Sequence, residues 1–158
     1  MNCLINHENN YLNYYFAGRF EESGKINIYK LSQGRGSFVC YVAIRFRTKK
    51  EAELFKESFG GRVTHIKSKN NKSWKNVRKK RWLWNLDSSL GAPEFAGAIL
   101  PFIFSNLMIR KLELIRKFYF YRQKCATRHS FIRGTKKLTD IGKQRKKFYQ
   151  QMKRLNKQ

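Results

Sequence analysis

Two neighbouring carboxylates, Glu21 and Glu22, stand at the end of an aromatic-rich segment over residues 11–23 that reads as a helix. The C-terminal end of a helix carries partial negative charge, so a carboxylate there is electrostatically unfavourable. Carboxylates gathered at that position become favourable when they share a cation, and magnesium prefers carboxylate oxygens. Such a site would serve metal-assisted phosphodiester hydrolysis.

The position that follows the two carboxylates is Ser23, whose one neutral hydroxyl is a poor ligand for magnesium. Glu22 is a poor replacement for a ligand at position 23, because successive residues of a helix point about 100° apart. We therefore expect Glu21, Glu22 and Ser23 to form a degenerate site, with no catalytic residue and no cofactor. If the site is active, Glu21 is the expected metal ligand and magnesium the expected ion.

The segment Phe16–Gly24 reads F-A-G-R-F-E-E-S-G, with small residues, an acidic residue and a final glycine. It resembles the LAGLIDADG motif, the signature helix of a family of homing endonucleases and intron maturases. The alanine, both glycines and the first acidic position (Glu21) are retained. The second acidic position, which supplies the metal-binding carboxylate in the family, is Ser23. The resemblance implies a nuclease scaffold that lacks one catalytic carboxylate.

Two further segments, Phe59–Val63 (F-G-G-R-V) and Ala98–Phe102 (A-I-L-P-F), also look like parts of this family, so the resemblance covers residues 10–123. It implies that two motif helices pack closely against each other, which a chain with one motif achieves only as a homodimer. It also implies that the outward-facing residues of a sheet lie on nucleic acid.

The apolar periodicity predicts the elements that position the motif. Alternating apolar and polar residues over 37–47 are typical of a strand with one buried face, and Thr48 with Glu51 forms a capping box. The expected elements are a helix over 11–23, strands over 26–30 and 37–47, a helix over 49–59, strands near 62–67 and 81–86, a helix from Pro93, and a helix over 107–123. These predict an α+β fold, a LAGLIDADG-like α-β-β-α-β-β-α-α domain with one antiparallel four-stranded sheet and a basic C-terminal helical tail.

The expected organisation is an N-terminal arm (1–9), a LAGLIDADG-like nucleic-acid-binding domain (10–123) and a basic C-terminal extension (124–158). In the extension, Ile141, Phe148, Met152 and Leu155 fall on one side of a helix whose other sides are basic. Such a helix can dock on protein and touch phosphates, or lie on an anionic membrane.

The net charge of +25 on 158 residues indicates a polyanionic partner, because a compact chain with that charge repels itself. Residues 127–158 hold 11 Lys or Arg and one Asp, so a charge of 11 − 1 = +10 lies there and 25 − 10 = +15 in the rest. Both parts are expected to contact the polyanion.

The residues expected to bind nucleic acid fall in three groups. Outward strand positions offer polar and basic side chains suited to phosphates and base edges, and residues 67–81 combine eight basic residues with a tryptophan that can stack on unpaired bases. The strand and turn group is Lys25, Asn27, Tyr29, Gln33, Arg35, Tyr41, Arg45, Arg47, Arg62, Thr64 and Lys67; the connecting run adds Lys69, Lys72, Trp74, Lys75, Arg78, Lys79, Lys80 and Arg81; the extension adds Lys136, Lys137, Arg145, Lys146 and Lys147. Trp82 and Trp84, at alternate strand positions, are expected in the core.

Three cysteines and three histidines show no ligand spacing, so we expect neither a zinc site nor a disulfide framework, and a reducing compartment. The apolar run 95–108 is too short to span a bilayer, and the N-terminus lacks a targeting pattern. With the abundance of Lys, Asn, Ile, Phe and Tyr, this favours an organelle-encoded protein of the mitochondrial matrix, and a bacterial or phage protein would fit the same features.

Three functions are compatible with these features. The first is a catalytically inactive LAGLIDADG-derived protein that binds structured RNA as a component of a mitochondrial ribosome, with ribosomal RNA and neighbouring ribosomal proteins as partners. The second is a homodimeric homing endonuclease that makes magnesium-dependent double-strand cuts in DNA. The third is an intron maturase, which binds intron RNA.

Overall fold

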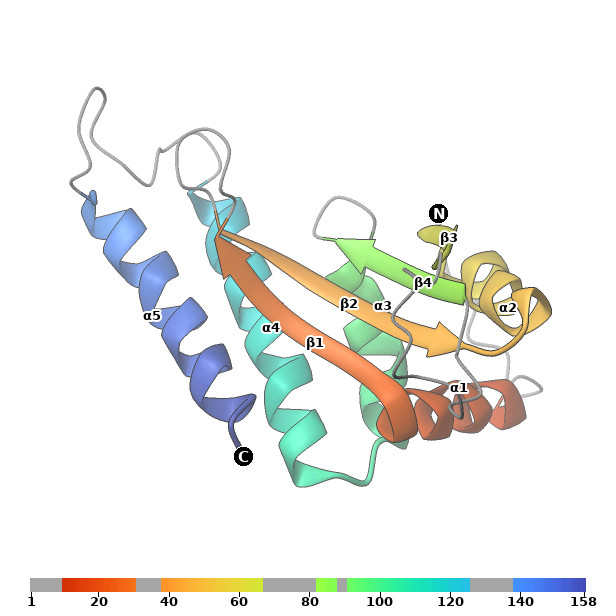
Figure 1. Ribbon diagram of the computed structural model, residues 1–158. Coiled ribbons are helices and arrows are strands. Elements are labelled where there is room, and N and C mark those ends of the chain that lie inside the picture. Colours follow the sequence, from red (N-terminus) through yellow and green to blue (C-terminus); the bar gives the residue numbers. More distant parts are fainter. Residues whose placement is uncertain (1–9, 31–37, 67–81, 88–90, 126–137) are drawn as a thin grey trace, which may run out of the picture.

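The computed structural model describes residues 10–30, 38–66, 82–87, 91–125 and 138–158, which form one α+β structure (Figure 1). The elements in chain order are α1 (Asn10–Ser23), β1 (Gly24–Lys30), β2 (Phe38–Phe46), α2 (Lys49–Phe59), β3 (Arg62–His65), β4 (Trp82–Asp87), α3 (Ala92–Ile99), the 3-10 turn η2 (Leu100–Phe102), α4 (Asn106–Lys124) and α5 (Asp140–Leu155). The predicted order of elements is confirmed, with boundaries shifted by one or two residues.

The sheet is antiparallel, four-stranded and ordered β1-β2-β4-β3. Its inner face buries alternate residues of β1 and β2, such as Ile28 and Val42, as the period of two predicts. The helices cover that face and complete the core. Phe55 of α2 lies at its centre, with ring centroids 4.7 Å from Phe16 and 5.1 Å from Trp84.

The predicted capping box of α2 is confirmed. Thr48 Oγ1 accepts from the Glu51 N–H at 3.3 Å and donates to Glu51 Oε2 at 2.8 Å. The helix ends at Gly60 and Gly61, whose φ angles of 74° and 89° belong to the left-handed region that favours glycine. The Trp84 Nε1–H donates to the Gly60 carbonyl oxygen at 2.8 Å, so the end of α2 is fixed to β4.

The expectation that both Trp82 and Trp84 are core residues holds only for Trp84, which is fully buried. Trp82 is half-buried, because it lies where β4 pairs with the short edge strand β3. Its ring packs against His65, with 4.8 Å between centroids, and the Lys49 ammonium lies 5.8 Å from its centroid.

The C-terminal helix α5 packs on α4 and β1, antiparallel to α4 and at the end of the sheet opposite to α2 (Figure 1). Met152 is fully buried in the common core, and the Phe148 ring lies 5.7 Å from Phe118. The apolar stripe predicted for the extension therefore faces protein. None of the helices in the described ranges is long and apolar enough to cross a membrane.

Arg145 was expected to contact nucleic acid, but it is only 8% exposed. Its Nη2 donates to the Cys125 carbonyl oxygen at 3.1 Å, which ties α5 to the end of α4. Burial, with the nearby Arg122 charge, lowers the pKa of Arg145 from its usual value. The reason is its position on the helix: Arg145 lies on the same side as Ile141 and Met152, so its side chain is directed into the packing interface.

Candidate nucleic-acid interface and motif carboxylates

The outward face of the sheet is a polar surface whose side chains are ordered in rows by the strand register. One row crosses all four strands and consists of Lys25, Ala43, Asn85 and Arg62. Ala43 is almost fully buried in the middle of this row, whereas Lys25 and Arg62 at its two ends are exposed. The small Ala43 side chain therefore does not project between the two exposed cations.

The neighbouring rows add further polar groups. Arg45 of β2 lies beside Leu83 and in line with Thr64, and Arg47 follows at the end of the strand; both arginines are exposed. On the other side Asn27 and Tyr41 pair, in line with Asp87, the one carboxylate that the described strands place on this face. A surface of this composition can bind phosphates electrostatically and reach base edges with Arg and Asn side chains.

An aromatic pair lies on the same face near the end of β1. The rings of Tyr29 and Tyr41 meet edge to face, with 6.1 Å between centroids and 83° between planes. Burial, and then the Asp87 carboxylate, raises the pKa of Tyr29, and burial raises the pKa of Tyr41, so both phenols are neutral at physiological pH. Neutral aromatic rings beside cations are suited to stacking with nucleic-acid bases.

The structure thus brings together, on one surface, the predicted residues Lys25, Asn27, Tyr29, Tyr41, Arg45, Arg47, Arg62 and Thr64. Lys146 and Lys147 are exposed on α5. The other predicted residues lie outside the described residues: Gln33, Arg35, Lys67, Lys69, Lys72, Trp74, Lys75, Arg78, Lys79, Lys80, Arg81, Lys136 and Lys137.

Glu21, the acidic residue that the motif retains, is bonded to the start of α4. Its Oε1 accepts from the backbone N–H groups of Phe104 at 2.9 Å and of Ser105 at 2.5 Å. Ser105 is the N-cap of α4, and its own Oγ accepts from the Met108 N–H at 3.3 Å. The carboxylate therefore lies at the electropositive end of a 19-residue helix, which offsets its unfavourable place at the end of α1.

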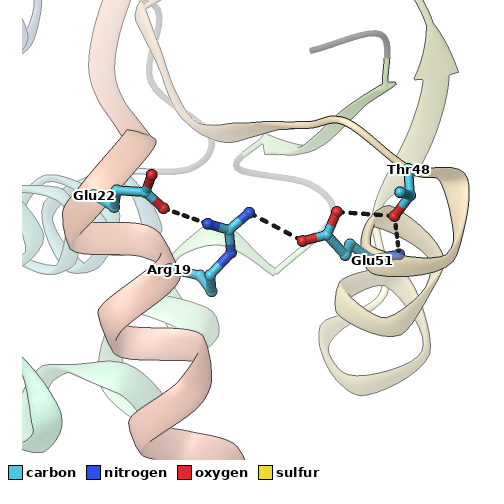
Figure 2. Close-up of polar contacts among 4 residues, drawn as sticks. All are labelled: Arg19, Glu22, Thr48 and Glu51. Carbon is cyan, nitrogen blue, oxygen red and sulfur yellow. Dashed lines mark hydrogen bonds and ion pairs between the residues drawn. The ribbon is translucent and has the colours of Figure 1, made fainter. Parts of the chain in front are cut away.

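The other carboxylate of this segment, Glu22, is bonded to Arg19 (Figure 2). The Arg19 guanidinium donates through Nη1 to Glu22 Oε2 and through Nη2 to Glu51 Oε1, the latter at 3.0 Å. Since Glu51 also completes the capping box with Thr48, the chain of polar contacts runs from α1 to the start of α2 (Figure 2). Arg19 stands where the LAGLIDADG motif has a leucine, and its guanidinium is the charged partner of Glu22.

These contacts decide whether the motif residues fit magnesium. One Glu21 oxygen is bonded to two amides, and Glu22 is paired with a guanidinium. Ser23 Oγ is buried and has no hydrogen-bond partner within the described ranges. The same ranges hold no group of three His, Cys, Asp or Glu side chains that could share a metal. Within one copy of the chain, these groups are therefore a poor set of ligands for a hard divalent cation.

Sequence reasoning missed the partners of both carboxylates. The contact of Glu21 with Ser105 spans 84 residues, and that of Arg19 with Glu51 spans 32. The sequence did hold a signal for the contact of Arg19, because a basic residue inside a motif helix that ends in carboxylates needs a charged partner. No comparable signal marked Phe104 or Ser105.

The outer face of α1 is open. Gly18 is exposed, and a methyl group added there would meet no described atom within 4 Å. Tyr11 and Tyr14 nearby are 89% and 53% exposed. The motif resemblance implies that a second copy of the chain packs against this helix.

The fold is similar to those of solved homing endonucleases. The archaeal intron-encoded homing endonuclease I-Vdi141I, complexed with DNA, has a TM-score of 0.67 and 14% identity, over 92% of this chain and 84% of that chain. The homing endonuclease I-CvuI in complex with its target has a TM-score of 0.59 and 13% identity, over 96% and 98%. I-TnaI, also a homing endonuclease, has a TM-score of 0.58 and 10% identity, over 92% and 93%.

No family model and no curated protein matches the chain. Identities of this size establish the fold and leave the activity open. The chain has the LAGLIDADG homing endonuclease fold.

Proposed function

We propose that this protein binds structured RNA through the outward face of its sheet without cleaving it, as a component of an organellar ribosome in the mitochondrial matrix. The observation that supports this proposal most strongly is the set of hydrogen bonds that Glu21 accepts. Its carboxylate is bonded to the backbone at the start of α4, while the sheet face beside it keeps its cations. A scaffold that keeps the binding surface and uses the motif carboxylate internally is suited to binding alone.

Structured RNA is favoured as the ligand because cations and aromatic rings share one face. Lys25 and Arg45 supply phosphate contacts, and Tyr29 with Tyr41 offers rings on which unpaired bases can stack. Bases stacked inside a regular duplex are less available for such contacts. Ribosomal RNA presents many unpaired bases in loops and bulges, and the net charge of +25 suits a permanent polyanionic environment.

A second candidate is a homodimeric homing endonuclease that cuts DNA with magnesium. It is favoured by the open outer face of α1 at Gly18, and by the DNA complexes of I-Vdi141I and I-CvuI. It requires Glu21 to bind a metal ion, either through Oε2 while Oε1 stays bonded to the two amides or by leaving those amides. An intron maturase would use the same RNA-binding surface as our first candidate and differs from it in the partner RNA.

The test of the proposed function is purification of the protein from its native source at moderate salt, with identification of the nucleic acid that accompanies it. Sedimentation with ribosomal RNA in a large particle is the expected result. A free dimer that cleaves a DNA duplex when magnesium is added would contradict the proposal. Co-purification with a single intron RNA would assign the maturase function.

Replacing Arg45 and Arg47 by Ala is expected to weaken RNA binding and its salt dependence. Each phosphate contact contributes about 0.7–0.9 to the slope of log K against log salt, so the slope falls by about 1.4–1.8 if each arginine makes one contact. The measurement is binding to an RNA stem-loop over a series of salt concentrations. The matched control is Lys50→Ala with Lys56→Ala on α2, which removes two exposed cations elsewhere. An unchanged slope in the arginine variant would show that the sheet face is not the interface.

Replacing Tyr29 and Tyr41 by Leu is expected to reduce binding to RNA with unpaired bases while leaving duplex binding nearly unchanged. Stacking contributes about 1–3 kcal/mol per base, so the loss for an unpaired loop is about tenfold or more. The comparison uses one stem-loop and a fully paired duplex of the same length. Tyr11→Leu with Tyr14→Leu on α1 is the control. Equal losses for both ligands would contradict a stacking role.

A further inference from the structure

The helix α5 has two chemically distinct faces. One face is packed: Met152 is fully buried, Leu155 is nearly so, and the Tyr149 ring lies 5.7 Å from Phe38. The Thr139 side chain caps its first turn by accepting from the Gly142 N–H at 3.0 Å. At the other end, Asn156 Nδ2 donates to the Ile26 carbonyl oxygen at 3.3 Å. The helix is therefore fixed to the body of the protein along its length.

The opposite face is almost entirely cationic. Its exposed cations recur at spacings of three, four and seven residues, so they lie on one side of the helix and form a single stripe. We call this stripe the α5 cationic face; it consists of Lys143, Lys146, Lys147, Lys153, Arg154 and Lys157. The one acidic residue of the helix, Asp140, is at its first turn and is paired with Lys143 at 2.8 Å. The other five cations extend over about three turns and face solvent, and the helix has no second carboxylate to pair with them.

The packing of α5 decides which polyanion this face fits. A membrane-bound amphipathic helix inserts its apolar side into the lipid. Here Met152 and Leu155 are already buried against protein, so the helix has no apolar side left to insert. What remains is a row of ammonium and guanidinium groups on a helix with a fixed backbone, which can pair with the phosphates of a nucleic acid.

The α5 cationic face and the sheet face point in different directions, although the end of α5 reaches the edge of the sheet face, where Asn156 Nδ2 donates to Asn27 Oδ1 at 3.4 Å. Phe38, against which Tyr149 packs, belongs to the buried inner face of β2, so α5 lies in the helical layer behind the sheet. Figure 1 places α5 outside α4, at the margin of the molecule. The cations of α5 point away from that packed side, whereas Lys25 and Arg45 lie on the outward face of the sheet.

From this arrangement we infer that the α5 cationic face binds the phosphates of a second RNA segment while the sheet face holds the first. The inference rests on the proposed function for the first surface and adds a second one, so that the protein joins two RNA segments. Recognition at α5 is by backbone charge and not by base sequence, because lysines at this spacing present no paired hydrogen-bonding pattern.

The experiment measures both contacts in the full-length protein. An RNA stem-loop is immobilised at low density and loaded with protein, and capture of a second, fluorescent stem-loop is then recorded per bound protein. One variant carries Lys146→Gln, Lys147→Gln and Lys153→Gln. The matched control carries Lys49→Gln, Lys50→Gln and Lys56→Gln on α2, the same charge change on three exposed helical lysines. Circular dichroism verifies that both variants are folded.

The wild type and the α2 control are expected to capture the second stem-loop. The α5 variant is expected to bind the first stem-loop nearly as the wild type does and to lose capture of the second by about tenfold or more, since each lost phosphate contact weakens binding. Undiminished capture by the α5 variant would overturn the inference, as would an equal loss in the α2 control.

Membrane binding and failure of the first RNA contact are two further outcomes that would overturn the inference. If the wild type binds vesicles containing phosphatidylserine, and the α5 variant loses that binding but still captures RNA, the face is a membrane surface and the inference is wrong. If the wild type does not bind the first stem-loop, the proposed function itself fails, and this inference with it.

Discussion

Replacing Gly24 by Ala is expected to lower the free energy of unfolding by about 1–3 kcal/mol, the usual cost of forcing extra volume into a packed site. Gly24 is the last residue of the motif and the first of β1. A Cβ atom there would lie 2.6 Å from Cδ2 of the fully buried Phe20, and closer still to the Phe20 carbonyl oxygen. Because one of these atoms belongs to the helix backbone, a rotamer change cannot relieve the clash.

The other motif glycine provides the control. Gly18 is exposed in the middle of α1, with open space around it among the described residues. Gly18→Ala is therefore expected to stabilise the monomer by about 0.5–1 kcal/mol, because alanine is the better helix residue. Denaturant unfolding of the two variants makes the comparison. Similar losses for both would contradict a purely intrachain role for Gly24.

Gly18→Ala also reports on the oligomeric state. If two copies pack closely through α1, an added methyl group lies in the contact and weakens association. Sedimentation equilibrium distinguishes the outcomes: a dimer that dissociates in this variant favours the endonuclease arrangement, whereas an unchanged monomer favours the RNA-binding one. The same glycine thus separates the two candidate functions without an activity assay.

The fold was predictable because its signals are local. The alternation of β2, the capping box at Thr48 and the glycine pair after α2 each lie within a few residues, and each is confirmed. The outward strand residues followed from the same period of two. The packing of α5 was implied by its apolar stripe, but the surface that receives it comes from β1 and α4, which are distant in sequence.

The burial of Arg145 could have been predicted by placing the residues of the extension on a helical wheel. Grouping Arg145 with Lys146 and Lys147 as possible phosphate contacts ignored its position on the apolar side of α5. The partners of Glu21 had no such signal, because the N–H groups of Phe104 and Ser105 become donors only where α4 begins beside the end of α1. A motif identifies the family position that a residue occupies, whereas the contacts of that residue depend on the tertiary structure.

Removal of the Glu21 side chain is expected to lower the free energy of unfolding by about 2 kcal/mol, since Glu21→Ala leaves two backbone donors without their charged acceptor. Glu21→Gln keeps a neutral acceptor oxygen and is expected to cost about half as much, because hydrogen bonds to charged groups are roughly twice as strong. Glu22→Ala is the matched control. Glu22 is exposed and paired with Arg19 at the surface, so its loss costs about 1 kcal/mol or less.

The same variants test whether Glu21 holds a metal. A ligand that binds only the folded state raises stability according to its concentration and affinity. If Glu21 is an internal cap, magnesium leaves the unfolding of the wild type unchanged at constant ionic strength, and Glu21→Ala lowers stability equally with or without the ion. If magnesium stabilises the wild type and Glu21→Ala abolishes that effect, the carboxylate is a metal ligand. Because Glu21 Oε1 is already bonded to two amides, the first result is expected, and with it a scaffold whose motif carboxylate serves the fold.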